Sequence, residues 1–126
     1  MSWQPEVDEI NKRRELARRQ GGEASIERHH KLGKLTLRER FEALLDEGSF
    51  CEQGRMAGGA TLDDDGEVES FDPANYLLGS GKVNSRTVVV GGEDFTLKGG
   101  SPNAAGYRKS VYAEHFAMDL RSPLIR

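Results

Sequence analysis

The feature that most constrains the fold is a pair of apolar segments joined by only two residues. The segments "YLLGSGKV" (76–83) and "RTVVV" (86–90) flank Asn84 and Ser85, an arrangement typical of a tight β-hairpin. Residues 88–90 are a continuous run of β-branched valines, as expected of a strand that is covered on both faces. The sequence therefore predicts a hairpin that lies between two layers.

A helix and a further strand are predicted after this hairpin. Apolar residues recur at helical spacings of three and four at Tyr107, Val111, Tyr112, Phe116 and Leu120. Pro123 ends the helix, and the apolar "LI" after it begins another segment. The order strand, loop, helix, strand is typical of an α/β layer, but so few strands leave the core faces short of partners. We therefore expect these residues to be the opening of a larger fold.

Two helices are predicted before residue 34. The segment "PEVDEINKRRELARRQ" (5–20) has an early proline, acids first and bases last, and a Gly-Gly stop after it. It offers little apolar surface, so we expect it to lie across another surface. A short second helix should end near Gly33, with Ile26 and Leu32 as its apolar anchors.

The clearest helix is predicted over residues 36–48. Thr36 and Glu39 have the spacing of a capping box, and Gly48 supplies a C-terminal stop. One stripe of the helix is apolar and consists of Leu37, Phe41, Leu44 and Leu45. We expect the helix to dock by this stripe.

The stretch from Gln53 to Asn75 is rich in glycine and acidic residues and has no sustained period, which predicts a solvated, mobile loop. Its "LDDDGEVE" is similar to the start of a calcium-binding loop. Such a loop needs a closing glutamate twelve residues from its start, counted inclusively, and from Asp63 that position is Ala74. No calcium site is therefore predicted.

No other metal site is predicted either. Cys51 is the only cysteine, and no Cys/His set has the spacing of a zinc site. His29 and His30 are adjacent, so on a helix they would point about 100° apart and could not readily share one metal. We expect both histidines to be exposed.

Composition excludes several function classes. The 126 residues fit about one domain, and with 36% hydrophobic and 31% charged residues part of the chain should lie outside any core. The nearest approach to a basic patch, residues 12–19, is interrupted by Glu15, so we expect no nucleic-acid binding. No apolar run could span a membrane and no signal peptide opens the chain, so we expect a cytoplasmic location.

Two separated motifs resemble one known family. The segment "KLGKLTLRERFEALLDEGSF" (31–50) contains a lysine- and glycine-containing turn, a Thr-x-Arg-Glu-Arg helix start and a Leu-Leu-Asp-Glu-Gly-Ser-Phe close. The segment "EDFTLKGGS" (93–101) follows in the correct order as a strand-to-loop passage. Together they resemble the N-terminal part of the N-lobe in the carboxyltransferase (β) subunits of biotin-dependent acyl-CoA carboxylases.

This resemblance implies an α/β fold, specifically part of a crotonase-like spiral of ββα units preceded by N-terminal helices. It implies a reaction that moves a carboxyl group from carboxybiotin to the α-carbon of an acyl-CoA thioester, with biotin carried on a partner. Biotin carboxylase and a biotin carboxyl carrier are the implied partners. The full-length protein is expected to be a homo-oligomer, because in the family the N-lobe of one subunit meets the C-lobe of another.

The family's enolate-binding glycine turn follows a sequence similar to "SPLIR" and is not found within these 126 residues. We therefore expect this chain alone to be inactive, either as a fragment or as a truncated product. Two other functions stay open. One is a non-catalytic interaction module derived from the N-lobe, and the other is a different crotonase-fold acyl-CoA enzyme, such as a decarboxylase or hydratase.

The resemblance places Gly99, Gly100 and Ser101 at the turn into the next helix, with Phe95 and Leu97 as wall residues. Backbone amides at such a turn can meet an acyl-CoA group or its phosphates. Glycine pairs also occur there simply because the backbone needs a positive φ. Both interpretations of Gly99 to Ser101 remain open, and these three are our candidate cofactor-binding residues.

We assign no catalytic residue and no metal ligand. Asp94 and His115 are expected to serve packing or hydrogen bonding. Lys98, Arg108 and Lys109 could attract CoA phosphates, although solvated positions are the commoner situation for such side chains.

The predicted organisation has three parts. Residues 1–50 form an N-terminal helical segment, 51–75 an acidic, glycine-containing loop region, and 76–126 the start of a crotonase-like carboxyltransferase N-lobe.

Overall fold

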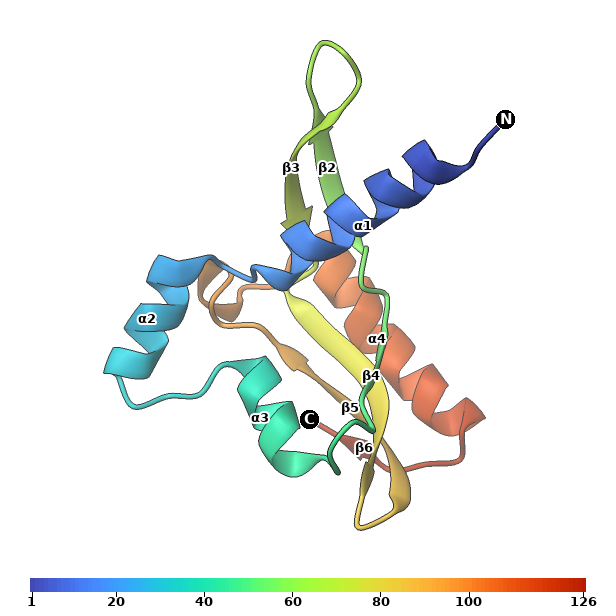
Figure 1. Cartoon of the computed structure of the whole chain (residues 1–126). Coiled ribbons are helices and arrows are strands. Elements are labelled where there is room, and N and C mark those ends of the chain that lie inside the picture. Colours follow the sequence, from blue (N-terminus) through green and yellow to red (C-terminus); the bar gives the residue numbers. More distant parts are fainter.

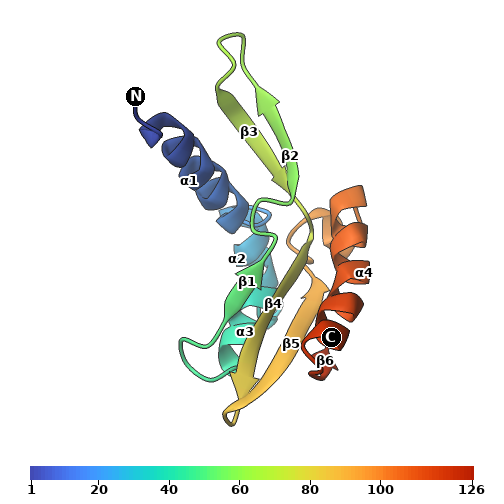
Figure 2. The same cartoon turned by 90° about the vertical axis from the view of Figure 1, so that its right-hand side faces the viewer.

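A four-stranded sheet between two helical layers forms the centre of the molecule (Figure 1, Figure 2). The computed structural model describes all 126 residues. The strand order is β1-β4-β5-β6, with β1 at Cys51–Gln53, β4 at Tyr76–Val83, β5 at Arg86–Glu93 and β6 at Leu124–Ile125. The first three strands are antiparallel, and β6 runs parallel to β5.

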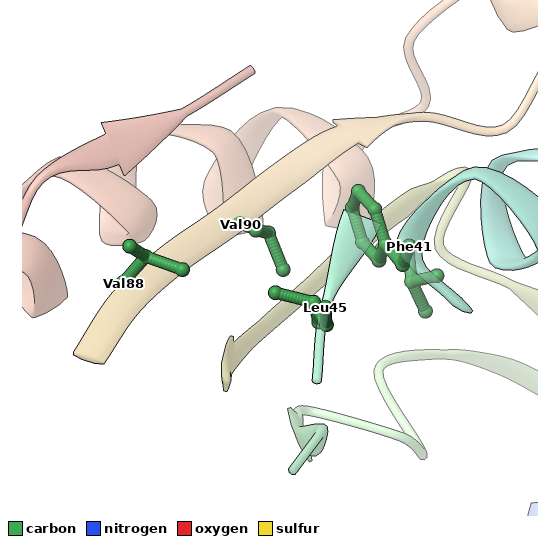
Figure 3. Close-up of a cluster of buried hydrophobic side chains, with 5 residues drawn as sticks. Phe41, Leu45, Val88 and Val90 are labelled. Carbon is green, nitrogen blue, oxygen red and sulfur yellow. The ribbon is translucent and has the colours of Figure 1, made fainter. Parts of the chain in front are cut away.

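The alternation of side chains along β5 divides the core in two. On one face, α3 (Leu37–Leu44) packs on Val88 and Val90, in a cluster with Phe41, Leu45 and Leu77 (Figure 3). On the other face, α4 (Ala104–Asp119) packs on Val89, in a cluster with Tyr76, Leu78, Ala113 and Ala117. The predicted hairpin covered on both faces is confirmed.

The two-residue turn of this hairpin has the predicted geometry. Asn84 and Ser85 both have positive φ, at 49° and 67°, as the favoured two-residue hairpin turn requires. The carboxylate of Asp46 accepts their backbone N–H groups at 3.0 and 2.8 Å. Because Asp46 lies just after α3, the same segment that covers the sheet also holds its turn.

The unit formed by β4, β5 and α4 is the predicted ββα unit, and α4 leads into the parallel strand β6. Val89 N–H donates to the carbonyl of Pro123 at 2.9 Å at the start of β6. The expected α/β architecture, with helices before the strands, is therefore confirmed.

The helix α4 buries a different face from the stripe whose spacing predicted it. Tyr107 is 66% exposed and Tyr112 is 50% exposed, whereas Gly106, Ala113 and Ala117 are buried. The small side chains let the helix axis approach β4 and β5 closely, which larger residues on that face would prevent. Helical period identified the element correctly but gave no indication of this orientation.

The N-terminal helices are α1 (Gln4–Arg18) and α2 (Glu23–Lys31). The prediction that the first helix lies across another surface is confirmed, because α1 packs on β3 while burying only Ala17. Ile26 of α2 is half-buried, but Leu32 is 65% exposed, so its predicted role as an anchor is wrong. No helix combines the length and apolar character needed to cross a bilayer.

The capping box of α3 is confirmed. Glu39 N–H donates to the Thr36 hydroxyl at 3.3 Å, and Thr36 N–H donates to the Glu39 carboxylate at 2.7 Å. The helix ends at Leu44, before the predicted stop at Gly48. The reason is that Leu45 adopts an extended backbone, which carries its side chain into the core and leaves Leu44 40% exposed.

Residues 53–75, predicted to be a solvated loop, instead contain a second antiparallel hairpin. Its strands are β2 (Gly58–Leu62) and β3 (Val68–Pro73), and it projects beyond the sheet next to α1 (Figure 1, Figure 2). Every residue of β2 is exposed. The sequence therefore lacks the apolar alternation that identifies a half-buried strand.

Candidate functional site

A cavity of about 520 Å³ lies between α3, the carboxyl ends of β5 and β6, and the loop that follows β5. Its walls are mainly apolar and consist of Leu35, Leu37, Phe41, Leu44, Phe95 and Ile125. Gly91 and Gly92 of β5 contribute only backbone to the lining. A Cβ on Gly92 would lie 3.0 Å from Leu37, so glycine there keeps the space open.

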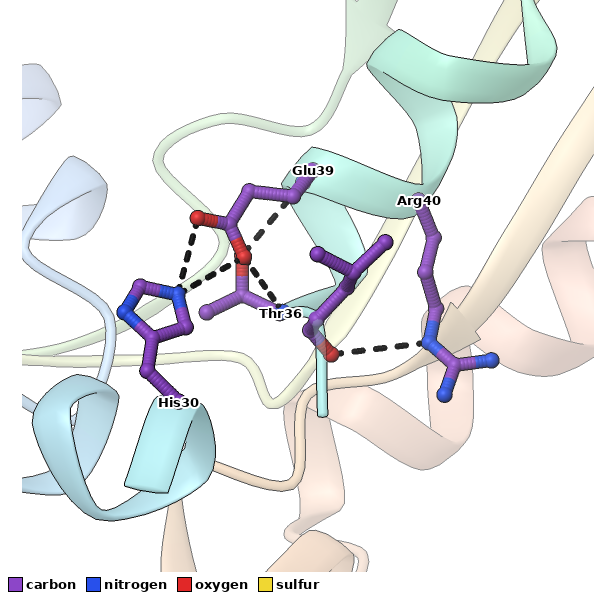
Figure 4. A network of polar contacts seen from close by, with 5 residues as sticks. His30, Thr36, Glu39 and Arg40 are labelled. Carbon is purple, nitrogen blue, oxygen red and sulfur yellow. Dashed lines mark hydrogen bonds and ion pairs between the residues drawn. The ribbon is translucent and has the colours of Figure 1, made fainter. Parts of the chain in front are cut away.

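Basic side chains surround this apolar space. His29, Lys34, Arg40 and Arg126 line it, with Glu93 as the one acidic residue. Arg126 is paired with Glu114 at 2.6 Å, and this contact raises the pKa of the guanidinium. Neither Lys34 nor Arg40 forms a salt bridge, and the only side-chain bond of Arg40 is a long one of 3.5 Å to the Leu35 carbonyl (Figure 4). Two cations without a salt-bridge partner therefore line an apolar cavity.

The adjacent histidines point in different directions, as their helical spacing predicted, but only His30 is exposed; the prediction that His29 is exposed is wrong, because it is half-buried. His29 lines the cavity, whereas His30 Nε2 lies 2.9 Å from the carboxylate of Glu39 (Figure 4). The contact with His30, followed by the Thr36 amide, lowers the pKa of Glu39 below its ordinary value. His30 therefore fixes α2 against the start of α3, on which the cavity is built.

Gly99, Gly100 and Ser101 form the predicted turn between β5 and α4. Gly99 and Gly100 have positive φ of 62° and 81°, which is the structural requirement that the sequence left open. Gly100 N–H donates to Leu97 O at 2.9 Å and Ser101 N–H to Lys98 O at 3.2 Å, while Gly99 N–H has no acceptor in the chain. Only the Gly99 amide is thus free for an outside acceptor.

These three residues do not themselves line the cavity. Phe95 lines the cavity, as predicted for a wall residue, and the residue is 59% exposed. A Cβ on Gly100 would lie 3.0 Å from the Phe95 ring, so the turn lies directly behind this ring. Leu97 instead lines a smaller pocket with Ala17 and Lys109, so the prediction that it is a wall residue of this cavity is wrong.

Asp94 has the hydrogen-bonding role that the sequence suggested. It is buried, and one carboxylate oxygen accepts both the backbone N–H of Thr96, at 2.9 Å, and its hydroxyl, at 2.6 Å. The Thr96 hydroxyl in turn accepts Gly21 N–H at 3.0 Å. This chain of contacts ties the α1–α2 connection to the loop after β5. His115 is exposed on α4, and its side chain forms no hydrogen bond and joins neither core cluster, so the packing or hydrogen-bonding role expected of it is wrong.

The three cations proposed for CoA phosphates do not line the cavity. Lys98 lies 3.4 Å from Asp72, and Arg108 is exposed. Lys109 is half-buried and donates to the Gly54 carbonyl at 3.2 Å, and burial lowers its pKa to about 8. No group of three or more His, Cys, Asp or Glu side chains is arranged to hold a metal ion.

The sequence did not identify Lys34 and Arg40 as functional residues. Both lie within the motif of residues 31–50, but their relation to Phe95 and Ile125 depends on packing between segments far apart in the chain. A local pattern holds no signal for such a relation.

The carboxyl transferase domain family matches residues 28–126. The chain is 37% identical over 119 residues, 94% of its length, to the propionyl-CoA carboxylase beta chain of Cereibacter sphaeroides. It is 30% identical over 105 residues, 83% of its length, to the methylmalonyl-CoA decarboxylase subunit alpha of Veillonella parvula.

Among solved structures, the hexameric transcarboxylase 12S with methylmalonyl-coenzyme A and methylmalonic acid bound matches 98% of the chain, with a TM-score of 0.79 and 29% identity. The chain spans 23% of the Cereibacter protein, 21% of the Veillonella protein and 24% of the transcarboxylase chain. It thus corresponds to between a fifth and a quarter of each relative.

Proposed function

The chain belongs to the carboxyl transferase domain family, and on that premise we propose that it forms part of a carboxyltransferase subunit of a biotin-dependent acyl-CoA carboxylase. The reaction would transfer a carboxyl group from carboxybiotin to an acyl-CoA. Carboxybiotin, carried by a partner, supplies the activated carboxyl group. The residues of this chain would bind and orient the acyl-CoA.

The observation that carries this proposal is the apolar cavity with unpaired cations at its edge. An acyl-CoA combines negatively charged phosphates with apolar and aromatic groups. Lys34 and Arg40 provide positive charge without a carboxylate partner, and Phe41 and Phe95 provide aromatic surface in the same cavity. Charged groups at the mouth and apolar groups inside are the usual composition of a small-molecule site.

The glycine turn has a supporting role in this proposal. Phe95 would contact the ligand directly, with Gly100 closely packed behind its ring. The Gly99 amide is the donor of the turn that could meet an acceptor on the ligand. Gly99, Gly100 and Ser101 thus remain our candidate ligand-binding turn, and we propose no catalytic residue within the chain.

Biotin carboxylase and a biotin carboxyl carrier are the proposed partners, and a homo-oligomer is the proposed assembly. The related transcarboxylase is described as a hexamer, which supports the second point. The single, exposed Cys51 suits a reducing setting, so we propose a cytoplasmic location.

Binding of CoA and propionyl-CoA to the 126-residue chain, measured by isothermal titration calorimetry, tests the site. Removing one unpaired cation by Lys34→Ala or Arg40→Ala should weaken CoA binding by about tenfold. Arg108→Ala is the matched control, because this exposed arginine lies away from the cavity. No detectable CoA binding by the unaltered chain, or equal loss in the Arg108 variant, would refute the proposed site.

Activity requires a second assay. The chain is combined with biotin carboxylase, a biotinylated carrier, ATP, labelled bicarbonate and a panel of acyl-CoA thioesters. The same assay is run on any longer product of the same reading frame. Absence of labelled carboxyl in every acyl-CoA, from every product, would rule out carboxyl transfer.

A decarboxylase is the second candidate, because the methylmalonyl-CoA decarboxylase subunit of Veillonella parvula is 30% identical to the chain. Both reactions would use the same acyl-CoA cavity. Loss of carbon dioxide from methylmalonyl-CoA, without carboxyl transfer from a biotinylated carrier in the presence of ATP and bicarbonate, would favour decarboxylation.

A further inference from the structure

The loop from residue 94 to 103 carries Phe95 and the glycine turn, yet few apolar contacts hold it. Phe95 is 59% exposed, and Lys98, Gly99 and Ser101 are exposed as well. Its defined conformation must therefore come mainly from hydrogen bonds to the rest of the molecule. The partners of these bonds show which residue outside the loop holds its two ends.

One residue outside the loop bonds to both of its ends. Asn75, immediately before β4, accepts the N–H of Asp94 on its backbone carbonyl at 2.8 Å. Its side-chain amide donates to the carbonyl of Ser101, and its side-chain oxygen accepts the N–H of Asn103 at 3.2 Å. The beginning and the end of the loop are therefore held at one point.

The side chain of Asn75 is enclosed, and both its nitrogen and its oxygen form hydrogen bonds. The residue is 2% exposed, so its amide could not exchange these partners for water without opening the structure. The first turn of α4 leaves room for it, because a Cβ on Gly106 would lie 2.2 Å from the Asn75 side-chain oxygen. Asn103 caps the same turn by accepting Gly106 N–H at 2.7 Å. The start of α4 and the loop thus share one polar anchor.

We propose that Asn75 is the positioning residue of the ligand-binding loop. It sets the span between Asp94 and Ser101, and so decides where Phe95 and the free Gly99 amide are presented. This inference rests on the proposed function, because it assigns the loop to an acyl-CoA site. Asn75 itself would not touch the ligand.

The test is Asn75→Asp in the 126-residue chain. An aspartate has the same shape and can still accept the Asn103 N–H, but its second oxygen would face the Ser101 carbonyl, where the amide had donated. We expect the affinity for CoA to fall by about tenfold or more. Backbone hydrogen exchange at Gly100 and Ser101 should accelerate by a similar factor.

Phe116→Ala is the matched control for a loss of global stability. Phe116 packs against the core cluster between α4 and the sheet, none of whose members lines the cavity, and it lies well beyond the first turn of α4, so its truncation should lower stability without reaching the loop. We expect unchanged CoA affinity in this variant. The exchange rate of Val89, deep in the sheet, should report global opening in both variants.

Unchanged CoA affinity in Asn75→Asp would overturn the inference, as would an equal loss in Phe116→Ala, which would make the effect one of stability alone. Failure of the unaltered chain to bind CoA would refute the proposed function instead. In that case, exchange at Gly100 and Ser101 decides whether Asn75 holds the loop. An unchanged exchange rate at Gly100 and Ser101 in Asn75→Asp would show that Asn75 does not hold the loop, and would overturn the inference as well.

Discussion

Replacement of Lys109 by methionine should make the protein more stable at neutral pH. Lys109 is a half-buried residue of α4 that reaches the segment after β1, where its ammonium group donates to the Gly54 carbonyl. Burial lowers its pKa from the ordinary 10.5 to about 8, even though the nearby Glu52 carboxylate opposes this shift. The folded protein therefore holds this charge at a cost, which a methionine of similar length would remove.

The size of the effect follows from the shift. A difference of 2.5 between 10.5 and about 8 corresponds to about 3 kcal/mol at roughly 1.4 kcal/mol for each unit of pKa. Solvent still reaches this half-buried group, which reduces the expected gain in the free energy of unfolding to about 1–2 kcal/mol. The Gly54 carbonyl is on an exposed residue, so water can replace the lost hydrogen bond.

The pH dependence identifies the cause. Because the folded-state pKa of Lys109 is lowered, the unfolded chain binds more protons between about pH 8 and 10.5, and wild-type stability gains relative to the variant over that range. The advantage of Lys109→Met should therefore be constant below pH 8 and decline up to 10.5. Burial raises the pKa of Tyr76 above its ordinary 10.0, which removes stability as the pH rises past about 10, but this contribution cancels between the two proteins.

Urea unfolding followed by circular dichroism measures these differences, since the only tryptophan, Trp3, is 74% exposed and a poor reporter of the core. Lys82→Met, at an exposed lysine of β4, is the control for removal of a lysine charge. A Lys109 variant less stable than wild type at pH 7, or a difference that stays constant from pH 7 to 10.5, would refute the reasoning.

Two further predictions concern the contacts on which the cavity rests. Gly21→Ala should cost about 2–4 kcal/mol in the free energy of unfolding, because its Cβ would lie 1.8 Å from Thr96 O. Gly59→Ala is the control and should cost less than about 1 kcal/mol, because no atom lies within 4 Å of its Cβ. Equal urea midpoints for the two variants would contradict this prediction. Thr36→Ala should cost about 1 kcal/mol through loss of the α3 cap, and Thr36→Ser should retain most of the stability. If Ser and Ala prove equally destabilising in thermal unfolding, the hydroxyl contact with Glu39 N–H is not the cause.

Local rules were sufficient wherever the cause of a structure lies within a few residues of it. The capping box at Thr36 and Glu39 depends on a spacing of three residues, and the turn at Asn84 and Ser85 depends on two residues that tolerate positive φ. The run of valines in β5 predicted a strand covered on both faces because a β-strand points successive side chains in opposite directions.

The same rules failed where burial is decided by a distant partner. The hairpin of β2 and β3 has almost no buried face, so nothing in its sequence distinguishes it from a loop. Its strand β3, which contains the buried Val68, packs against α1, a helix far away in the sequence. On α4, the aromatic residues predicted the helix but not its orientation. The close approach to the sheet selected Gly106, Ala113 and Ala117 instead.

The candidate site divides in the same way. The sequence by itself determined the two motifs, the glycine turn at residues 99–101 and Phe95 as a wall residue. Each of these features can be recognised from a short continuous stretch of sequence. Only the tertiary structure brought Lys34 and Arg40 to the same cavity as Phe95 and made Asn75 the anchor of the loop. Such contacts join residues more than 20 positions apart, and their geometry exists only after the sheet and helices have packed.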